Sequence, residues 1–262
     1  MYDFLKYKNV AIRYRATGKG RAVVLLHGFL ENSSMWNELV VHLSKQYRVV
    51  CIDLLGHGKS GNLGYIHTME AQAQLVKAVL RHLRLRKYIL VGHSMGGYIS
   101  LAFAEMYPQS VRGLCLMNST AMADSEEKKA SRNRAIKAVK HNYKTFVRIA
   151  IPSLFAEENR SAFKSEIIQH TNEALKLSRQ GIIASLEGMK IRKDRTALLK
   201  LITFQKFMII GKKDPILIPA MLMKQVQYTN TKIIELPGGH MSHIENKETF
   251  VNAIKEFVCT CN

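Results

Sequence analysis

The feature that most constrains the fold of this chain is the pentapeptide Gly92-His93-Ser94-Met95-Gly96, because of the two segments that flank it. Residues 88–91 before it form an apolar run typical of a buried strand, and residues 95–107 after it have a helical pattern that stops at Pro108. Where a strand turns directly into a helix, the residue between them lies on a sharp turn. Small residues on either side of it make room for the crossing backbone. The pentapeptide therefore predicts a serine presented at the carboxyl end of a strand.

Strand and helix patterns alternate along most of the remaining chain. The apolar or alternating runs that predict strands, the first of them an edge strand, are residues 10–14, 22–26, 48–52, 111–117, 207–210 and 232–236. Helical spacing follows in residues 36–43, with Ser33 and Ser34 as candidate caps, and in residues 68–83, 220–226 and 247–258. This alternation with short connections predicts an α/β fold, a mostly parallel central sheet with helices on both faces.

The alternation is interrupted once, by a long segment without a strand pattern. Residues 119–202 show amphipathic helical patterns only. We therefore expect an α/β core formed by residues 1–118 and 203–262, and a helical lid at 119–202 inserted before the last two strands. Ligands of such sheets bind at the carboxyl ends of the strands, so the lid is expected to cover that edge.

Composition is that of a folded domain without membrane segments. The chain has 262 residues, 47% of them hydrophobic and 23% charged, and no apolar run approaches the ~18 residues of a membrane helix. The N-terminal residues have no signal-peptide pattern, so we expect a cytoplasmic protein. Four cysteines lack the spacing of a disulfide framework or a zinc site, and we expect them to be structural.

A formal net charge of +19 predicts attraction to anionic surfaces, nucleic acids or acidic proteins. The basic residues are spread along the chain and form no recognised nucleic-acid module, so a nucleic-acid partner is not expected. The lid carries more basic than acidic residues. An acidic carrier protein therefore remains an alternative partner, beside the simpler interpretation of a solvated helix face.

In motif content and order, the chain resembles the α/β-hydrolase superfamily over nearly its full length. Beside the serine pentapeptide, residues 26–29 (Leu-His-Gly-Phe) look like the family's oxyanion-hole segment. Residues 53–60 match its D-x-x-G-x-G-x-S loop, which we interpret as structural. The resemblance implies that Ser94 is a nucleophile and that the backbone N–H groups of Phe29 and Met95 bind an oxyanion.

The same resemblance places an acid after the strand that follows the lid and a histidine after the last strand. Asp214 and His240 stand there, and the order Ser, Asp, His is the one typical of this fold. His240 would take the proton of Ser94, while Asp214 would hold the imidazole tautomer. Asp124 remains an alternative acid and His243 an alternative base.

The other histidines are not assigned to the chemistry. We expect the side chain of His93 to point away from Ser94. Isolated histidines without metal-ligand spacing are interpreted as surface or core residues, and they are His42, His67, His82, His141 and His170. No metal and no cofactor are expected.

A serine at the turn favours acyl transfer to water over the chemistry of family members with an aspartate there, such as haloalkane dehalogenases. The leading hypothesis is a carboxylic-ester hydrolase acting on a small or medium acyl ester, with Leu154 and Phe155 of the lid in the acyl pocket. Two alternatives use the same motif. One is hydrolysis of a carbon–carbon bond, or elimination, on a small anionic metabolite. The other is a ligand receptor of this fold with weak turnover.

Overall fold

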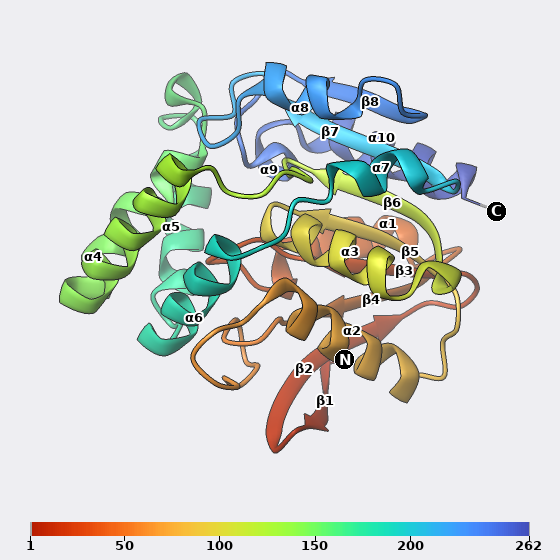
Figure 1. The fold of residues 1–262 in the computed structure, drawn as a ribbon, viewed down its shortest axis with the longest axis horizontal. Coiled ribbons are helices and arrows are strands. Elements are labelled where there is room, and N and C mark those ends of the chain that lie inside the picture. Colours follow the sequence, from red (N-terminus) through yellow and green to blue (C-terminus); the bar gives the residue numbers. More distant parts are fainter. Residues whose placement is uncertain (1, 262) are drawn as a thin grey trace.

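Eight strands form one mixed sheet in the computed structural model, which describes residues 2–261. Their order is β1-β2-β4-β3-β5-β6-β7-β8 (Figure 1). The pairs β1/β2 and β2/β4 are antiparallel and the other pairs are parallel. The strands are β1 (Tyr2–Tyr7), β2 (Val10–Thr17), β3 (Ala22–Leu26), β4 (Arg48–Ile52), β5 (Tyr88–His93), β6 (Val111–Met117), β7 (Gln205–Gly211) and β8 (Thr231–Leu236). The predicted fold class, a mostly parallel sheet in an α/β-hydrolase architecture, is confirmed.

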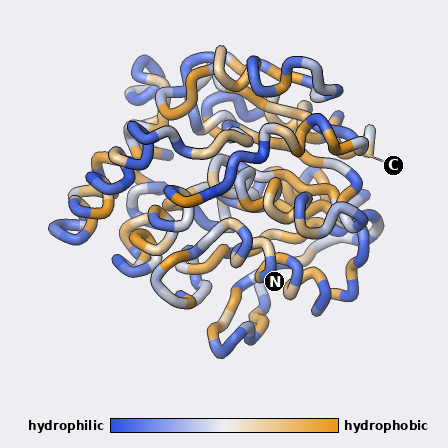
Figure 2. The backbone as a smooth tube through the Cα atoms, viewed as in Figure 1, coloured by the Kyte–Doolittle hydropathy of each residue, from blue (hydrophilic) through white to orange (hydrophobic). Residues whose placement is uncertain are grey.

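The central strands are buried on both faces, which explains their continuous apolar runs. In β3, Val23 and Leu25 belong to one hydrophobic cluster, while Val24 and Leu26 belong to the cluster on the other face. Figure 2 shows hydrophobic residues concentrated along these strands. The cluster of Val23 and Leu25 is completed by helices α1 (Asn37–Leu43) and α10 (Lys247–Thr260). The cluster of Val24 and Leu26 is completed by α2 (Met69–His82), α3 (Met95–Met106) and α8 (Pro219–Val226).

Two local predictions differ from the structure. Residues 10–14 were expected at the sheet edge, but β1 pairs outside β2 and forms the edge itself. In β1 every side chain is half-buried or exposed, and its short sequence lacks the apolar run that marks the central strands. Neither Ser33 nor Ser34 is a helix cap: Asn32 caps the 3₁₀ turn η1 (Ser33–Trp36) by accepting from Ser34 N, and α1 begins after Trp36 without a side-chain cap.

Between β6 and β7 the described chain is helical and contains no strand. Figure 1 shows α4, α5 and α6 together at one end of the sheet, and α4 packs against α6. The elements of this inserted segment are α4 (Glu126–Ala150), η3 (Pro152–Leu154), η4 (Glu157–Asn159), α5 (Lys164–Ala174), α6 (Arg179–Lys190) and α7 (Thr196–Leu201). Among residues 2–261, none of the helices combines the length and apolar character needed to cross a bilayer.

Candidate active site

Ser94 lies on the turn between β5 and α3 with φ 48° and ψ −112°, a backbone conformation that costs a non-glycine residue free energy. The surroundings hold it there. Ser94 N donates to Met117 O at 2.9 Å, and Ser119 Oγ donates to Ser94 O at 2.7 Å. Glycine is required on both sides, because a Cβ on Gly92 would overlap the backbone of Gly96, and one on Gly96 would overlap Leu26 O. The strained turn is therefore built into the packing of β3, β5 and α3.

Asp214 and His240 come from the loops after β7 and β8 and meet beside this turn. His240 Nδ1 lies 2.8 Å from Asp214 Oδ2, and both side chains are buried. Asn118 Nδ2 donates to the same carboxylate oxygen at 3.1 Å, and Ile216 N donates to Asp214 Oδ1 at 2.8 Å. These contacts orient the carboxylate toward the ring and leave Nε2 of His240 for proton transfer.

The charge state of Asp214 follows from the same contacts. Burial works to raise the pKa of this carboxyl, but the neighbouring His240, the Asn118 amide and the Ile216 N–H outweigh it. The net shift lowers the pKa, so Asp214 is a carboxylate at neutral pH. It can therefore accept from His240 Nδ1–H and stabilise positive charge on the imidazole.

Of the two predicted oxyanion donors, Phe29 lines the same cavity as Ser94, and Met95 directly follows Ser94 in the chain. Phe29 follows β3, and the next residue, Leu30, has φ 65°, a left-handed conformation that sets the turn. Met95 is the first residue of α3, where backbone N–H groups point out of the helix end. Among residues 2–261, neither Phe29 N nor Met95 N has a hydrogen-bond partner. Both are therefore free to donate to a ligand.

Ser94 and His240 open into one cavity of about 390 Å³ under the inserted helices. Its walls are mostly apolar, which suits an acyl chain. The apolar residues that line it are Phe29, Leu30, Tyr98, Ala135, Phe146, Ile149, Ala150, Leu154, Leu186, Met189 and Ile216. Two basic residues also line it, but Arg132 pairs with Asp124, and Lys128 Nζ donates to Ile216 O at 2.9 Å.

The structure places the two predicted lid residues differently. Leu154 lines the cavity, and its carbonyl accepts from His240 N at 3.0 Å. Phe155 does not line it. Its ring is fully buried in a separate cluster with Ile167 and Met241, so the prediction of Phe155 as a pocket residue is corrected. Adjacent residues on an irregular segment face opposite ways, and the sequence does not reveal which one faces the cavity.

The alternative residues have other partners. Asp124 binds Arg132 and, at 2.5 Å, Arg192 Nη1, so it is committed to an ion-pair cluster within the inserted segment. His243 lies in α9 (Ser242–Glu245), near Glu31 rather than Asp214. The structure thus brings His240, and not His243, to the acid after β7.

The loop at residues 53–60 has the structural role expected for it. Asp53 Oδ2 accepts from Arg13 Nε at 2.6 Å and from Lys59 N at 2.8 Å, and Oδ1 accepts from Ser33 N at 2.9 Å. Burial opposes ionisation of Asp53, but His27, Arg13 and Ser33 outweigh it and lower its pKa. One carboxylate therefore joins β2, β4 and the start of η1.

Two features of the site were missed by sequence reasoning. Asn118, which orients Asp214, directly follows β6 at the edge where ligands of such sheets bind, so its position was a usable signal. The side chain of His93 forms a buried pair with Glu31, whose Oε2 lies 2.6 Å from His93 Nδ1. His93 Nε2 lies 3.0 Å from His240 O, so this ring supports the histidine loop.

Comparison with known proteins agrees with this architecture. A model of the α/β hydrolase fold family matches residues 21–148. An uncharacterized protein of Mycobacterium bovis is 35% identical over 106 residues, 40% of this chain and 31% of that protein. The acetyltransferase component of an acetoin cleaving system from Pseudomonas putida is 30% identical over 233 residues, 87% of this chain and 61% of that protein. This chain thus spans about a third of the length of the mycobacterial relative.

A solved structure of a thermophilic esterase from Thermogutta terrifontis superimposes with a TM-score of 0.92 at 29% identity, and the match covers 98% of each chain. The match includes the helices between β6 and β7 as well as the sheet, because it covers nearly the whole chain. The chain belongs to the α/β-hydrolase superfamily.

Proposed function

We propose that this protein is a serine hydrolase that cleaves a carboxylic ester with a small or medium acyl group through an acyl-enzyme. The observation that carries the proposal is the shared cavity, into which Ser94 on its strained turn and the Asp214-bound His240 both open. A nucleophile beside a base that a third group orients is the arrangement expected for acyl transfer.

In the proposed reaction, His240 Nε2 removes the proton of Ser94 while Oγ attacks the ester carbonyl carbon. The N–H groups of Phe29 and Met95 bind the oxyanion of the tetrahedral intermediate. The intermediate collapses, the C–O bond to the alcohol breaks, and His240 gives its proton to the leaving oxygen. Water then attacks the acyl-enzyme by the same steps, which releases the acid and restores Ser94.

The volume and walls of the cavity support the substrate size. About 390 Å³ is near the lower end of the ~300–1,000 Å³ typical of small-molecule sites. The helices of residues 119–202 act in this proposal as the lid, since α4 and η3 supply much of the apolar wall. The thermophilic esterase that superimposes over 98% of the chain is an independent argument for ester chemistry.

Carbon–carbon bond hydrolysis or elimination on an anionic metabolite is the second candidate, and the basic residues at the cavity bear on it. Arg132 lines the cavity, but its guanidinium pairs with Asp124, and Lys128 is bonded to a backbone carbonyl. Asp124 also pairs with Arg192, so some positive charge remains at this wall. The ester is nevertheless the better fit because the walls are mostly apolar.

The test is hydrolysis of p-nitrophenyl esters from acetate to decanoate by the wild type, Ser94→Ala and the control Ser161→Ala, an exposed serine of the inserted segment. Ser94→Ala should lower kcat by at least about 10³-fold, and Ser161→Ala should leave it unchanged. A fluorophosphonate should label the wild type and the control but not Ser94→Ala. Undiminished hydrolysis by Ser94→Ala would overturn the proposal, and ester binding without turnover by the wild type would favour a receptor.

A further inference from the structure

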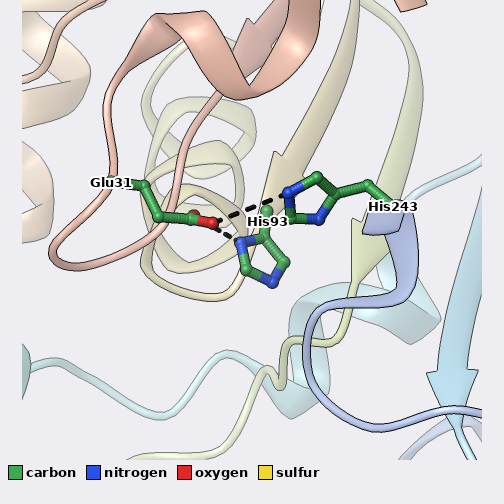
Figure 3. A group of neighbouring side chains, drawn as sticks. All are labelled: Glu31, His93 and His243. Carbon is green, nitrogen blue, oxygen red and sulfur yellow. Dashed lines mark hydrogen bonds and ion pairs between the residues drawn. The ribbon is translucent and has the colours of Figure 1, made fainter. Parts of the chain in front are cut away.

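Three buried side chains from distant segments meet next to the turn that carries Ser94. Glu31 comes from the loop after β3, His93 ends β5, and His243 comes from α9 (Figure 3). One possible ligand atom from each lies within 4.8 Å of the other two. Two imidazoles and a carboxylate at such spacing are a common donor set for transition-metal ions.

Several polar atoms of this group lack partners. Among residues 2–261, Glu31 Oε1 and both ring nitrogens of His243 are buried without a hydrogen bond. Glu31 Oε1 lies 3.9 Å from His243 Nε2, which is too long for a direct bond. Unpartnered buried polar atoms are costly, so their convergence at one point indicates a ligand that would satisfy them.

The other two residues are already oriented as ligands usually are. His93 Nε2 is bonded to His240 O at 3.0 Å, which leaves Nδ1 toward Glu31. Gly28 N donates to Glu31 Oε2 at 2.7 Å and fixes that carboxylate. Metal-binding histidines commonly donate their second N–H to a backbone carbonyl, and ligating carboxylates are commonly hydrogen-bonded.

The group is reached through a cavity of about 630 Å³ whose charge favours cations. Besides Glu31, the acidic side chains that line it are Glu38, Glu166 and Glu173. The basic ones are Arg13 and Lys247, and these pair with Asp53 and Glu38. Glu173 pairs with Lys176, so the negative charge that remains in this cavity comes mainly from Glu31 and Glu166. His170 also lines the cavity, with its ring centroid 6.1 Å from that of His243.

We propose that Glu31, His93 and His243 bind one divalent transition-metal ion of the zinc class. Ligand atoms around a tetrahedral zinc lie roughly 3.3 Å apart, so small side-chain rotations suffice to form the site. Binding releases the proton between Glu31 and His93 to solvent, and water or His170 completes the coordination. Glu31, His93 and His243 belong to the loops of Phe29, Ser94 and His240, so the ion cross-links them. This role is independent of the ester chemistry.

The test is titration of chelator-treated, dialysed protein with Zn²⁺ by calorimetry, and with Co²⁺ by visible absorption. The wild type should bind one ion per chain, and its melting temperature should rise with Zn²⁺. Glu31→Gln and His243→Asn should each weaken binding by at least about tenfold and lose the thermal shift. His42→Asn, an exposed histidine of α1, and Cys259→Ser, an exposed thiol, are matched controls that should bind as the wild type does.

Circular dichroism checks that each variant is folded. If Glu31→Gln does not fold, His243→Asn alone still tests the proposal. The proposal is overturned if the wild type has no saturable site, or if folded His243→Asn binds Zn²⁺ as tightly as the wild type. It is also overturned if His42→Asn or Cys259→Ser weakens binding as much as His243→Asn. Esterase activity is not a readout, so failure here and failure of the ester proposal are distinguishable.

Discussion

Two buried carboxylate–histidine pairs flank the turn of Ser94, and they differ in what lies beyond the ring. Asp214 Oδ2 is 2.8 Å from His240 Nδ1, and Glu31 Oε2 is 2.6 Å from His93 Nδ1. His240 lines the apolar cavity with Ser94, and Asp214 leaves its Nε2 for a ligand. The second nitrogen of His93 is taken by His240 O instead.

The difference shows that a carboxylate–histidine pair does not define a role by itself. A ring with one nitrogen in a cavity can take up and return a proton, whereas a ring with both nitrogens bonded inside the protein holds position. At the second pair the reactive features are instead the unpartnered oxygen of Glu31 and the nearby His243. In the two proposals, the same two residue types serve proton transfer on one side and cation binding on the other.

The largest expected effect comes from Asp214→Asn. Without the carboxylate, His240 loses its preferred tautomer and the partner for its charge, so kcat for ester hydrolysis should fall by ~10⁴-fold. Steady-state kinetics with p-nitrophenyl butyrate measures this, and Zn²⁺ affinity should stay at the wild-type value. A variant with near-normal kcat would show that the Asp214–His240 pair is not the catalytic one.

Glu31→Gln should act on stability rather than on chemistry. Removing one partner of a buried ion pair typically costs ~3–5 kcal/mol, and here it also weakens the acceptor of Gly28 N. Urea denaturation should show this loss, while the folded fraction keeps kcat within about tenfold of the wild type. If kcat instead fell as far as in Asp214→Asn, the division of roles between the two pairs would be wrong.

Asn118→Ala should have a smaller effect than either carboxylate change. The amide donates to Asp214 Oδ2 and to Gly239 O, both at 3.1 Å, so its loss leaves the acid and the histidine loop less well oriented. We expect kcat to fall by roughly tenfold with little change in KM, since a positioning contact is lost and no substrate contact is. A changed KM with constant kcat would place Asn118 in substrate binding.

The smallest expected effect is on acid stability. The lowered pKa of Asp214 means that its carboxylate stabilises the fold above the unfolded pKa of ~4, and that this contribution is lost as the pH falls through the folded value. The unfolding free energy of the wild type should therefore drop more between pH ~5 and pH ~2 than that of Asp214→Asn. Equal pH dependence in urea titrations would contradict the assignment of that shift.

Local sequence patterns were sufficient for the central strands and for the turn at Ser94, but not for the edge strand β1. The central strands are apolar runs between short turns. Asp214 and His240 each lie in the loop after a strand, so chain order places them at one edge of the sheet. The Glu31–His93–His243 group could not be predicted in this way, because its members come from a loop, a strand end and a short helix with no fixed spacing. The wrong placement of Phe155 has a similar cause, since burial of one neighbour rather than the other depends on packing from α5 and α9.

The last residue of β6 and the two residues after it hold the backbone of Ser94 and the side chain of Asp214 in place. Met117 O accepts from Ser94 N, Asn118 contacts Asp214, and Ser119 Oγ donates to Ser94 O. Three consecutive residues thus fix the position of Ser94 relative to Asp214. The inserted helices begin only after these residues, so these contacts to Ser94 and Asp214 do not depend on the inserted segment. Grafting another helical segment between Ala121 and β7 should change which molecules enter and keep the spacing of Ser94 and Asp214, but it would remove the bond from His240 N to Leu154 O.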